Sequence, residues 1–307
     1  MSNSRFGFRT RNGSISSFIE SNTIQYLLDL YPNAAAAYSL RKLRNAYSGS
    51  AIRVRRSSDN AEQDIGFINN QLNISSLNSF VGASNGFVTT WYDQSGNNKN
   101  ITQSTASNQP IIVTNGVIIR ANSKPCIDFS KSSVPTELTN ASLTSNNQYW
   151  TIFGVVKYYT AINSSIYYYG RWISIGNIGT YDYNNTSSFL GFVTDRTDFG
   201  ITPPASVTGY NNTFTGLPIA YNNQYILNSL KTGNTIKNGV NNVLTSGFTQ
   251  SGTLNASAIR LGANITFSPE NNSNLYGTIQ EVIYYKTDIS SNLSAINTNI
   301  NNYYSAY

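Results

Sequence analysis

The chain has 307 residues, only 11% of them charged, and its formal net charge at pH 7 is +6. It contains no histidine, which excludes an imidazole base and a His-ligated metal, and its single cysteine, Cys126, excludes an intramolecular disulfide. No apolar run approaches the ~20 residues that a membrane helix needs, and the first residues lack the hydrophobic stretch of a signal peptide. We therefore expect no membrane partner.

The uncharged polar residues are unusually abundant. Asparagine alone accounts for roughly one residue in seven. The 22 tyrosines and 14 phenylalanines provide side chains that can form a hydrophobic core. Aromatic burial offsets the entropy lost on folding, so this composition argues against disorder. It predicts an ordered, turn-rich β protein.

Positive charge is concentrated near the N-terminus. Residues 1–56 carry nine basic and two acidic side chains, whereas the remainder is almost neutral. A basic patch permits nucleic-acid binding, but no nucleic-acid motif accompanies it, so we expect a protein partner instead. Residues 1–33 contain few apolar side chains and are predicted to form an N-terminal docking arm, in which Arg5, Arg9 and Arg11 contact that partner.

Two short helices are predicted before the strands begin. Residues 23–30 form the first, which Pro32 ends. Residues 34–47 form the second, with Asn33 as its N-cap and Gly49 just beyond its end. The apolar stripe of this second helix is expected to pack on a sheet.

From residue 51 onward the pattern is that of strands joined by turns. Residues 52–56 alternate apolar and basic side chains, and residues 57–60 turn the chain back toward an acidic strand at 62–67, which predicts cross-strand ion pairs for Arg53, Arg55 and Arg56. Further strands are predicted at 111–113, 117–120, 126–129, 149–158, 172–175, 189–193, 225–231, 258–261 and 277–285. Asn115-Gly116 and Asn238-Gly239 predict hairpin turns, and residues 289–303 predict a C-terminal helix.

The order of these elements indicates the fold class. Many strands lie at short spacing with turn residues between them, and helices occur only near the ends. This arrangement is typical of an all-β sandwich or jelly roll. No internal repeat and no linker follows residue 50, so we predict one domain over residues 34–307.

Residues 91–96, with the sequence Trp-Tyr-Asp-Gln-Ser-Gly, end a strand in a tight polar turn. An aromatic face beside a carboxylate and an amide suits sugar binding. The alternative is that Trp91 fills the core while Asp93 ties down the corner, and buried aromatics are the commoner case. We predict the structural role. Asp93, Asn97 and Asn98 also offer oxygen ligands for calcium, the one metal we consider, although such residues are typical of plain turns.

Several blocks, taken in order, resemble the catalytic domain of the α-L-arabinofuranosidase B family. They are residues 38–41 and 46–49, residues 52–59, residues 91–96 with Thr102-Gln103, and the ending formed by Leu261-Gly262, Gly277-Thr278, Glu281 and the final helix. The resemblance implies a concanavalin A-like (laminin G-like) jelly roll with short N-terminal and C-terminal helices. Similar domains recur in tailed-phage virion proteins.

The resemblance also indicates where catalytic residues would lie. A retaining glycosidase uses two carboxylates roughly 5 Å apart. Glu270 falls near the place of the family's acid/base, while the stretch that matches its nucleophile, residues 194–200, contains Asp195 and Asp198 but no glutamate. The family's adjacent cysteine pair is also missing. These departures favour a chain that hydrolyses no arabinofuranoside at a useful rate.

We therefore expect a phage virion-surface structural protein with a lectin-like, non-catalytic domain, located on the virion and without a cofactor. Its expected partners are other virion proteins, copies of itself, and cell-surface or environmental glycans. The expected carbohydrate-binding residues are Tyr168, Tyr169, Trp172, Tyr181 and Tyr183. Two alternatives remain open: a retaining arabinofuranosidase that uses Glu270 with Asp198 or Asp195, and a purely structural capsid or tail component.

Overall fold

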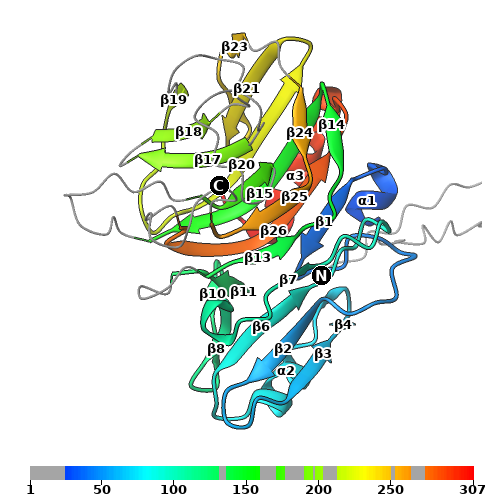
Figure 1. The fold of residues 1–307 in the computed structure, drawn as a ribbon, viewed down its shortest axis with the longest axis vertical. Helices are drawn as coiled ribbons and strands as arrows, with labels where there is room; N and C mark the ends of the chain where they lie inside the picture. Colours follow the sequence, from blue (N-terminus) through cyan, green and yellow to red (C-terminus); the bar gives the residue numbers. More distant parts are fainter. Residues whose placement is uncertain are drawn as a thin grey trace, which may run out of the picture.

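The computed structural model describes residues 25–130, 136–159, 171–176, 190–195, 198–202, 213–249, 253–263 and 274–307 (Figure 1). These residues form many strands and only three short α-helices: α1 (Leu27–Leu30), α2 (Ile74–Val81) and α3 (Leu293–Tyr304). No helix in the described ranges is long and apolar enough to cross a membrane. The predicted all-β class is confirmed.

The described strands include one 20-stranded sheet, which branches at β6 (Gly86–Trp91). On one side of β6 lie β2 (Ile52–Arg56) and then β3 (Glu62–Ile65). On the other side β6 pairs with both β7 (Ile101–Thr102) and β8 (Ile111–Thr114). Each of these two strands begins one layer of a sandwich.

The first layer continues from β8 through β12 (Ile127–Asp128), β26 (Gly277–Tyr285), β15 (Trp150–Tyr158), β20 (Gln224–Thr232) and β21 (Thr235–Val240), and β1 (Ala36–Ser39) also pairs with β26. The second layer continues from β7 through β13 (Leu138–Asn140), β25 (Ala258–Leu261), β16 (Ile173–Gly176), β17 (Leu190–Asp195), β18 (Asp198–Thr202) and β19 (Thr213–Pro218). Short strands complete the fold: β4 (Phe67–Ile68), β5 (Gln71–Leu72), β9 (Val117–Ile118), β10 (Arg120–Ala121), β11 (Lys124–Pro125), β14 (Ser145–Asn147), β22 (Val243–Leu244), β23 (Phe248–Thr249) and β24 (Leu254–Ala256). In Figure 1, β2 and β3 lie at the opposite end of the molecule from β21.

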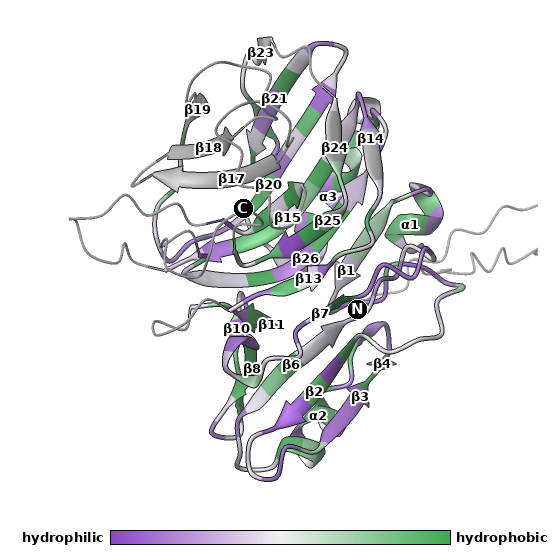
Figure 2. Cartoon of the chain, viewed as in Figure 1, coloured by the Kyte–Doolittle hydropathy of each residue, from purple (hydrophilic) through white to green (hydrophobic). Residues whose placement is uncertain are grey.

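The main hydrophobic core lies between the two layers. Alternate residues of each strand point into it, and they include the fully buried Trp91, Trp150 and Trp172. Figure 2 shows hydrophobic residues along β15 and β25 and hydrophilic residues along β2 and β3. Gly154 leaves room for the Trp172 ring, since a Cβ on this glycine would lie 2.2 Å from a ring carbon. Trp172, beside β16, therefore packs closely against β15 of the facing layer.

A second core covers the outer face of the first layer. Leu27 and Leu28 of α1 and Ile296 and Ile300 of α3 pack there, against side chains such as Phe153 of β15. Two residues of the predicted N-terminal arm are thus buried. Residues 1–24, including Arg5, Arg9 and Arg11, lie outside the described residues, so the docking arm stays a prediction.

The predicted helix over residues 34–47 is wrong. Ala36–Ser39 forms β1, which pairs antiparallel with β26, and the residues after it run as an irregular segment. The alanine-rich sequence favours a helix, but pairing with the central strand overrides that local propensity. Asn33 has φ +67°, whereas an N-cap residue is normally extended.

Helix α2 was absent from the sequence prediction. It carries a short apolar stripe, of which Leu77 and Val81 are buried. Its N-cap is Asn73, whose side chain accepts a hydrogen bond from the Ser76 amide at 3.0 Å. The first predicted helix also shortens to Leu27–Leu30, whereas the predicted C-terminal helix is confirmed as α3, preceded by a 3₁₀ turn at Ser290–Asn292.

The predicted strands after residue 110 occur with small differences in their ends, except that residues 117–120 fall on two short strands, β9 and β10, in different sheets. Asn115-Gly116 forms the predicted hairpin turn, with φ +49° and +75°, between β8 and β9. Asn238-Gly239 does not, because both residues pair with β20 inside β21. The turn falls instead at residues 241 and 242, two asparagines with φ +49° and +69°.

The predicted cross-strand ion pairs are confirmed for Arg53, whereas the ion pair of Arg56 is with a residue of the turn. Arg53 contacts Glu62 at 2.7 Å and Asp64 at 3.5 Å. Arg56 contacts Asp59 at 2.6 Å. Among the side-chain contacts of the described residues, Arg55 differs, since its guanidinium donates to the amide oxygens of Gln109 and Asn60 rather than to a carboxylate.

We expect Gly116→Ala to lower the free energy of unfolding by more than about 1 kcal/mol, because a left-handed residue is strained by a side chain. Its φ is +75°, and a Cβ there would lie 2.8 Å from the Gly82 carbonyl oxygen. Urea titration of both forms measures the difference. The matched control is Gly66→Ala, whose Cβ would meet no atom within 4 Å. Equal losses in the two variants would contradict the assignment of this turn.

Candidate functional site

The carboxylate of Asp93 ties the end of β6 to β1. One of its oxygens accepts hydrogen bonds from the amides of Ala37 and Ser95, both at 2.9 Å. The other accepts from the Ser95 hydroxyl at 2.7 Å and from the Lys99 amide at 3.0 Å. This buried carboxylate therefore accepts four hydrogen bonds from protein donors. The predicted structural role is confirmed, and Asp93 presents no free oxygen to calcium.

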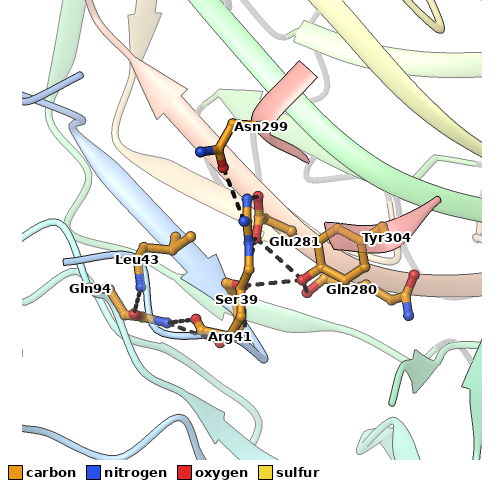
Figure 3. Close-up of polar contacts among 8 residues, drawn as sticks. All are labelled: Ser39, Arg41, Leu43, Gln94, Gln280, Glu281, Asn299 and Tyr304. Carbon is orange, nitrogen blue, oxygen red and sulfur yellow. Dashed lines mark hydrogen bonds and ion pairs between the residues drawn. The ribbon is translucent and has the colours of Figure 1, made fainter. Parts of the chain in front are cut away.

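Gln94 continues the same corner (Figure 3). Its amide nitrogen donates to the carbonyl oxygens of Ser39 and Arg41, each at 3.0 Å. Its amide oxygen accepts from the Leu43 amide at 2.8 Å. This side chain is fully buried, so it fixes the irregular segment that follows β1.

A buried ion pair lies beside that segment (Figure 3). The Arg41 guanidinium forms two hydrogen bonds to Glu281 of β26, Nε to Oε2 at 2.8 Å and Nη2 to Oε1 at 2.9 Å. The Ser39 hydroxyl donates to Glu281 Oε2 at 2.7 Å, and the Tyr304 hydroxyl lies 3.2 Å from the same oxygen. Arg41 also lies over the Tyr303 ring, with 5.0 Å to its centroid.

These contacts assign Glu281 a structural role. Burial alone would lower the pKa of Arg41, but the charge and hydrogen bonds of Glu281 raise it above its ordinary value, so Arg41 stays a cation. Burial, followed by the charge of Glu281, raises the pKa of Tyr304 well above its ordinary value. The network joins β1, β26 and α3, and Glu281 is only 1% exposed, so a substrate does not reach its carboxylate.

The candidate catalytic aspartates lie on adjacent strands. Asp195 ends β17 and Asp198 begins β18, and the two residues are directly opposite in the antiparallel register. Opposite residues in such a pair have Cα atoms about 4.5–5.5 Å apart. Glu270 lies outside the described residues, so its position relative to these aspartates stays a prediction.

One further carboxylate of the second layer has an unusual environment. Glu137 Oε2 lies 3.1 Å from Arg260 Nη1, and burial raises the pKa of this carboxyl while Arg260 opposes the rise. Arg260 Nε donates to the Thr139 hydroxyl at 3.1 Å. Three strand spacings separate β13 from β17, about 14 Å. Glu137 is therefore too distant from Asp195 to form a catalytic pair with it.

The predicted carbohydrate-binding aromatics are only partly described. Trp172 is fully buried against Gly154. A ring in the core has no face to offer a glycan, so this assignment is wrong. The prediction failed because the local sequence around a tryptophan at the end of a strand does not show whether its side chain points into the core or toward solvent. Tyr168, Tyr169, Tyr181 and Tyr183 lie outside the described residues.

No cluster of three or more His, Cys, Asp or Glu side chains that could hold a metal occurs within the described ranges. Cys126 is buried, and burial raises the pKa of its thiol to about 12. A thiol of this kind is a poor nucleophile at neutral pH. Cys126 is a buried core residue between β11 and β12.

The chain is similar to arabinofuranosidases in part of its sequence and in its fold. The family described as "Alpha-L-arabinofuranosidase B, catalytic" matches residues 27–127, about a third of the chain. An α-L-arabinofuranosidase of glycoside hydrolase family 54, soaked with a cyclic sulfate inhibitor, is 15% identical with a TM-score of 0.64, over 90% of this chain and 65% of its own. An arabinofuranosidase complexed with arabinofuranosyl-α-1,2-xylobiose is 16% identical with a TM-score of 0.60, over 90% and 64%. No curated protein matches.

The chain thus spans slightly less than two thirds of the length of these solved enzymes. At such low identity the likeness shows the sandwich fold that they share. The family match includes the earlier blocks of the sequence resemblance, from residue 38 to residue 103, whereas the C-terminal blocks lie outside it.

The expected virion-surface role is overturned by these matches. Both comparisons lead to glycoside hydrolases of the arabinofuranosidase type, and not to a phage structural, capsid or host-attachment protein. The sequence argument relied on the missing glutamate in residues 194–200 and on the absence of disulfides. Neither observation bears on the fold, and a missing residue type at one position does not identify a virion protein.

Proposed function

We propose that the protein is a glycoside hydrolase that acts on α-L-arabinofuranosides. The main support is that its fold matches solved arabinofuranosidases over 90% of the chain. The match to the family's catalytic domain over residues 27–127 supports the same activity independently.

We infer a retaining mechanism, in which two carboxylates flank the scissile bond at about 5 Å from each other. Asp195 or Asp198 attacks the anomeric carbon, while Glu270 protonates the departing glycosidic oxygen. Glu270 then takes a proton from water, which releases the sugar from the aspartyl ester. Asp195 and Asp198 are opposite each other in the register of β17 and β18, and the variants below decide which of them is the nucleophile.

The test is release of 4-nitrophenol from 4-nitrophenyl α-L-arabinofuranoside by the purified protein. We expect turnover that falls by about 10²–10⁴-fold in Glu270→Gln, since that is the usual contribution of a general acid–base group. One of Asp195→Asn and Asp198→Asn should lose activity as severely. Azide should restore turnover to Glu270→Ala by attacking the glycosyl-enzyme, and should not restore it to the nucleophile variant.

The matched control is Asp288→Asn, an exposed aspartate that precedes α3. It should keep the activity of the unmodified protein. An unmodified protein that releases no 4-nitrophenol and leaves arabinofuranosyl side groups of arabinoxylan untouched would refute the proposed function. Activity that survives in all three carboxylate variants would refute the residue assignment alone.

A further inference from the structure

Three adjacent strands of the first layer, β20, β15 and β26, place polar side chains opposite one another (Figure 1). Gln224 of β20 is opposite Lys157 of β15, and Lys157 is opposite Thr278 of β26. Directly opposite residues share one face of an antiparallel sheet, with Cβ atoms about 4.5–5.5 Å apart. Val156 points into the main core, so Lys157 and the two residues opposite it point outward. We call Gln224, Lys157 and Thr278 the outer triad.

Two members of the outer triad are buried polar groups without hydrogen bonds. Gln224 is only 5% exposed, and neither its amide nitrogen nor its amide oxygen has a hydrogen-bond partner among the described residues. The buried Thr278 hydroxyl has no partner of hydrogen-bonding geometry among the same residues, and its neighbour, the Cys126 thiol, is a weak donor and acceptor. A buried polar group without a protein partner normally binds water or a ligand.

The third member, Lys157, is a half-buried cation without a counter-charge. In the described part of the chain its ammonium forms no ion pair and no hydrogen bond, and it lies 5.9 Å from the centroid of the Tyr159 ring. The Asp128 carboxylate is two strands away in the register, about 10 Å, and accepts a hydrogen bond from the Tyr159 hydroxyl at 3.0 Å. Glu281, farther along β26, is neutralised by Arg41. The charge of Lys157 is therefore available to an anion.

Solvent reaches the outer triad at Lys157. The rings of Tyr159 and Tyr276, also half-buried, meet edge to face with 5.8 Å between their centroids. Asn223, directly before Gln224, is exposed. Helices α1 and α3 pack on this face farther along the strands. A ligand can therefore reach the Lys157 ammonium from solvent, with the more buried amide beside it.

The chemistry of the outer triad defines the ligand. The ammonium, the hydroxyl and the amide N–H all donate hydrogen bonds, which suits an anionic group. Gln224 also presents an amide oxygen, which needs a donor and repels an ion that carries acceptors alone, such as sulfate. A carboxylate with a hydroxyl group beside it satisfies both ends of the amide. Sugars that combine these two groups are uronic acids, and the Tyr159 ring offers their C–H groups an apolar face.

We propose that the outer triad binds a uronic acid. The ligand's carboxylate lies on the Lys157 ammonium and the Gln224 amide nitrogen, and a neighbouring hydroxyl of the sugar donates to the Gln224 amide oxygen. This site goes beyond the proposed function, because it involves no hydrolysis and belongs to the first layer, whereas Asp195 and Asp198 belong to strands of the second.

The test compares two glycosides that differ in one group. Methyl β-D-glucuronoside carries a carboxylate where methyl β-D-glucoside carries a hydroxymethyl group. In calorimetric titrations of the full chain, we expect saturable binding of the glucuronoside and none of the glucoside at the same concentrations. Lys157→Gln should raise Kd about tenfold or more, because a hydrogen bond to a charged group contributes that much. The matched control is Lys237→Gln, a half-buried lysine farther along the same face, which should leave Kd unchanged.

Gln224→Met separates binding from folding. This variant keeps the size of the side chain and removes both amide atoms, so Kd for the glucuronoside should rise about tenfold. Its melting temperature should stay the same or rise, since the protein no longer buries an unpaired amide. Equal binding of the two glycosides, no binding of either, or an unchanged Kd in both Lys157→Gln and Gln224→Met would refute the proposal. Sulfate that displaces the glucuronoside at equal concentration would also refute it. None of these measurements depends on turnover of an arabinofuranoside.

Discussion

Glu281→Gln is expected to lower the free energy of unfolding by about 3–5 kcal/mol, the usual cost of removing one partner from a buried ion pair. The carboxylate receives two hydrogen bonds from Arg41 and one from Ser39, and all of these groups are buried. In the variant the Arg41 cation stays in the interior without its counter-charge. Urea unfolding followed by tryptophan fluorescence measures the loss.

The matched control is Glu62→Gln, which breaks an ion pair of similar length at the surface. Its contact to Arg53 is 2.7 Å, but 36% of the Glu62 side chain and 41% of the Arg53 side chain are exposed. An exposed pair contributes roughly 0–1 kcal/mol. A loss in Glu281→Gln no larger than that of this control would contradict the structural role of the buried network.

Trp91→Ala should also be costly, at about 3–5 kcal/mol, because truncating a fully buried tryptophan leaves a large cavity. The side chain is 0% exposed in the main core and its ring centroid lies 6.1 Å from that of Tyr38. We expect a much lower melting temperature or a failure to fold. Thermal unfolding followed by circular dichroism measures the change.

Val117→Ala is the control for the tryptophan, since Val117 is 69% exposed and surface substitutions usually change stability by less than about 0.5 kcal/mol. A Trp91→Ala protein that melts with the unmodified protein yet loses affinity for arabinoxylan would show that this ring binds the ligand instead of filling the core.

Local sequence patterns predicted most of the sandwich. The strands of residues 258–261 and 277–285 were predicted at their observed bounds. Runs of β-branched and aromatic residues favour a strand whatever the distant parts of the chain do. The segment after Asn33 was not, because four successive alanines favour a helix until a distant strand pairs with them. That strand, β26, lies about 240 residues later in the chain, and no local pattern reveals it.

The interactions at the candidate site also differ in how far the local sequence could predict them. The role of Asp93 was predictable because its partners Ser95 and Lys99 are near in sequence. The pairing of Arg41 with Glu281 spans 240 positions, so no local pattern reveals it.

The position of β26 in the sheet affects how the chain is made. This strand pairs with β1, β12 and β15, all of which precede it by more than about 100 residues. During synthesis those three strands emerge long before their shared partner, with hydrogen-bonding edges and apolar faces unprotected. We expect a slow-folding chain whose sandwich cannot close before residue 285 has been synthesised, and that is most prone to aggregate until then.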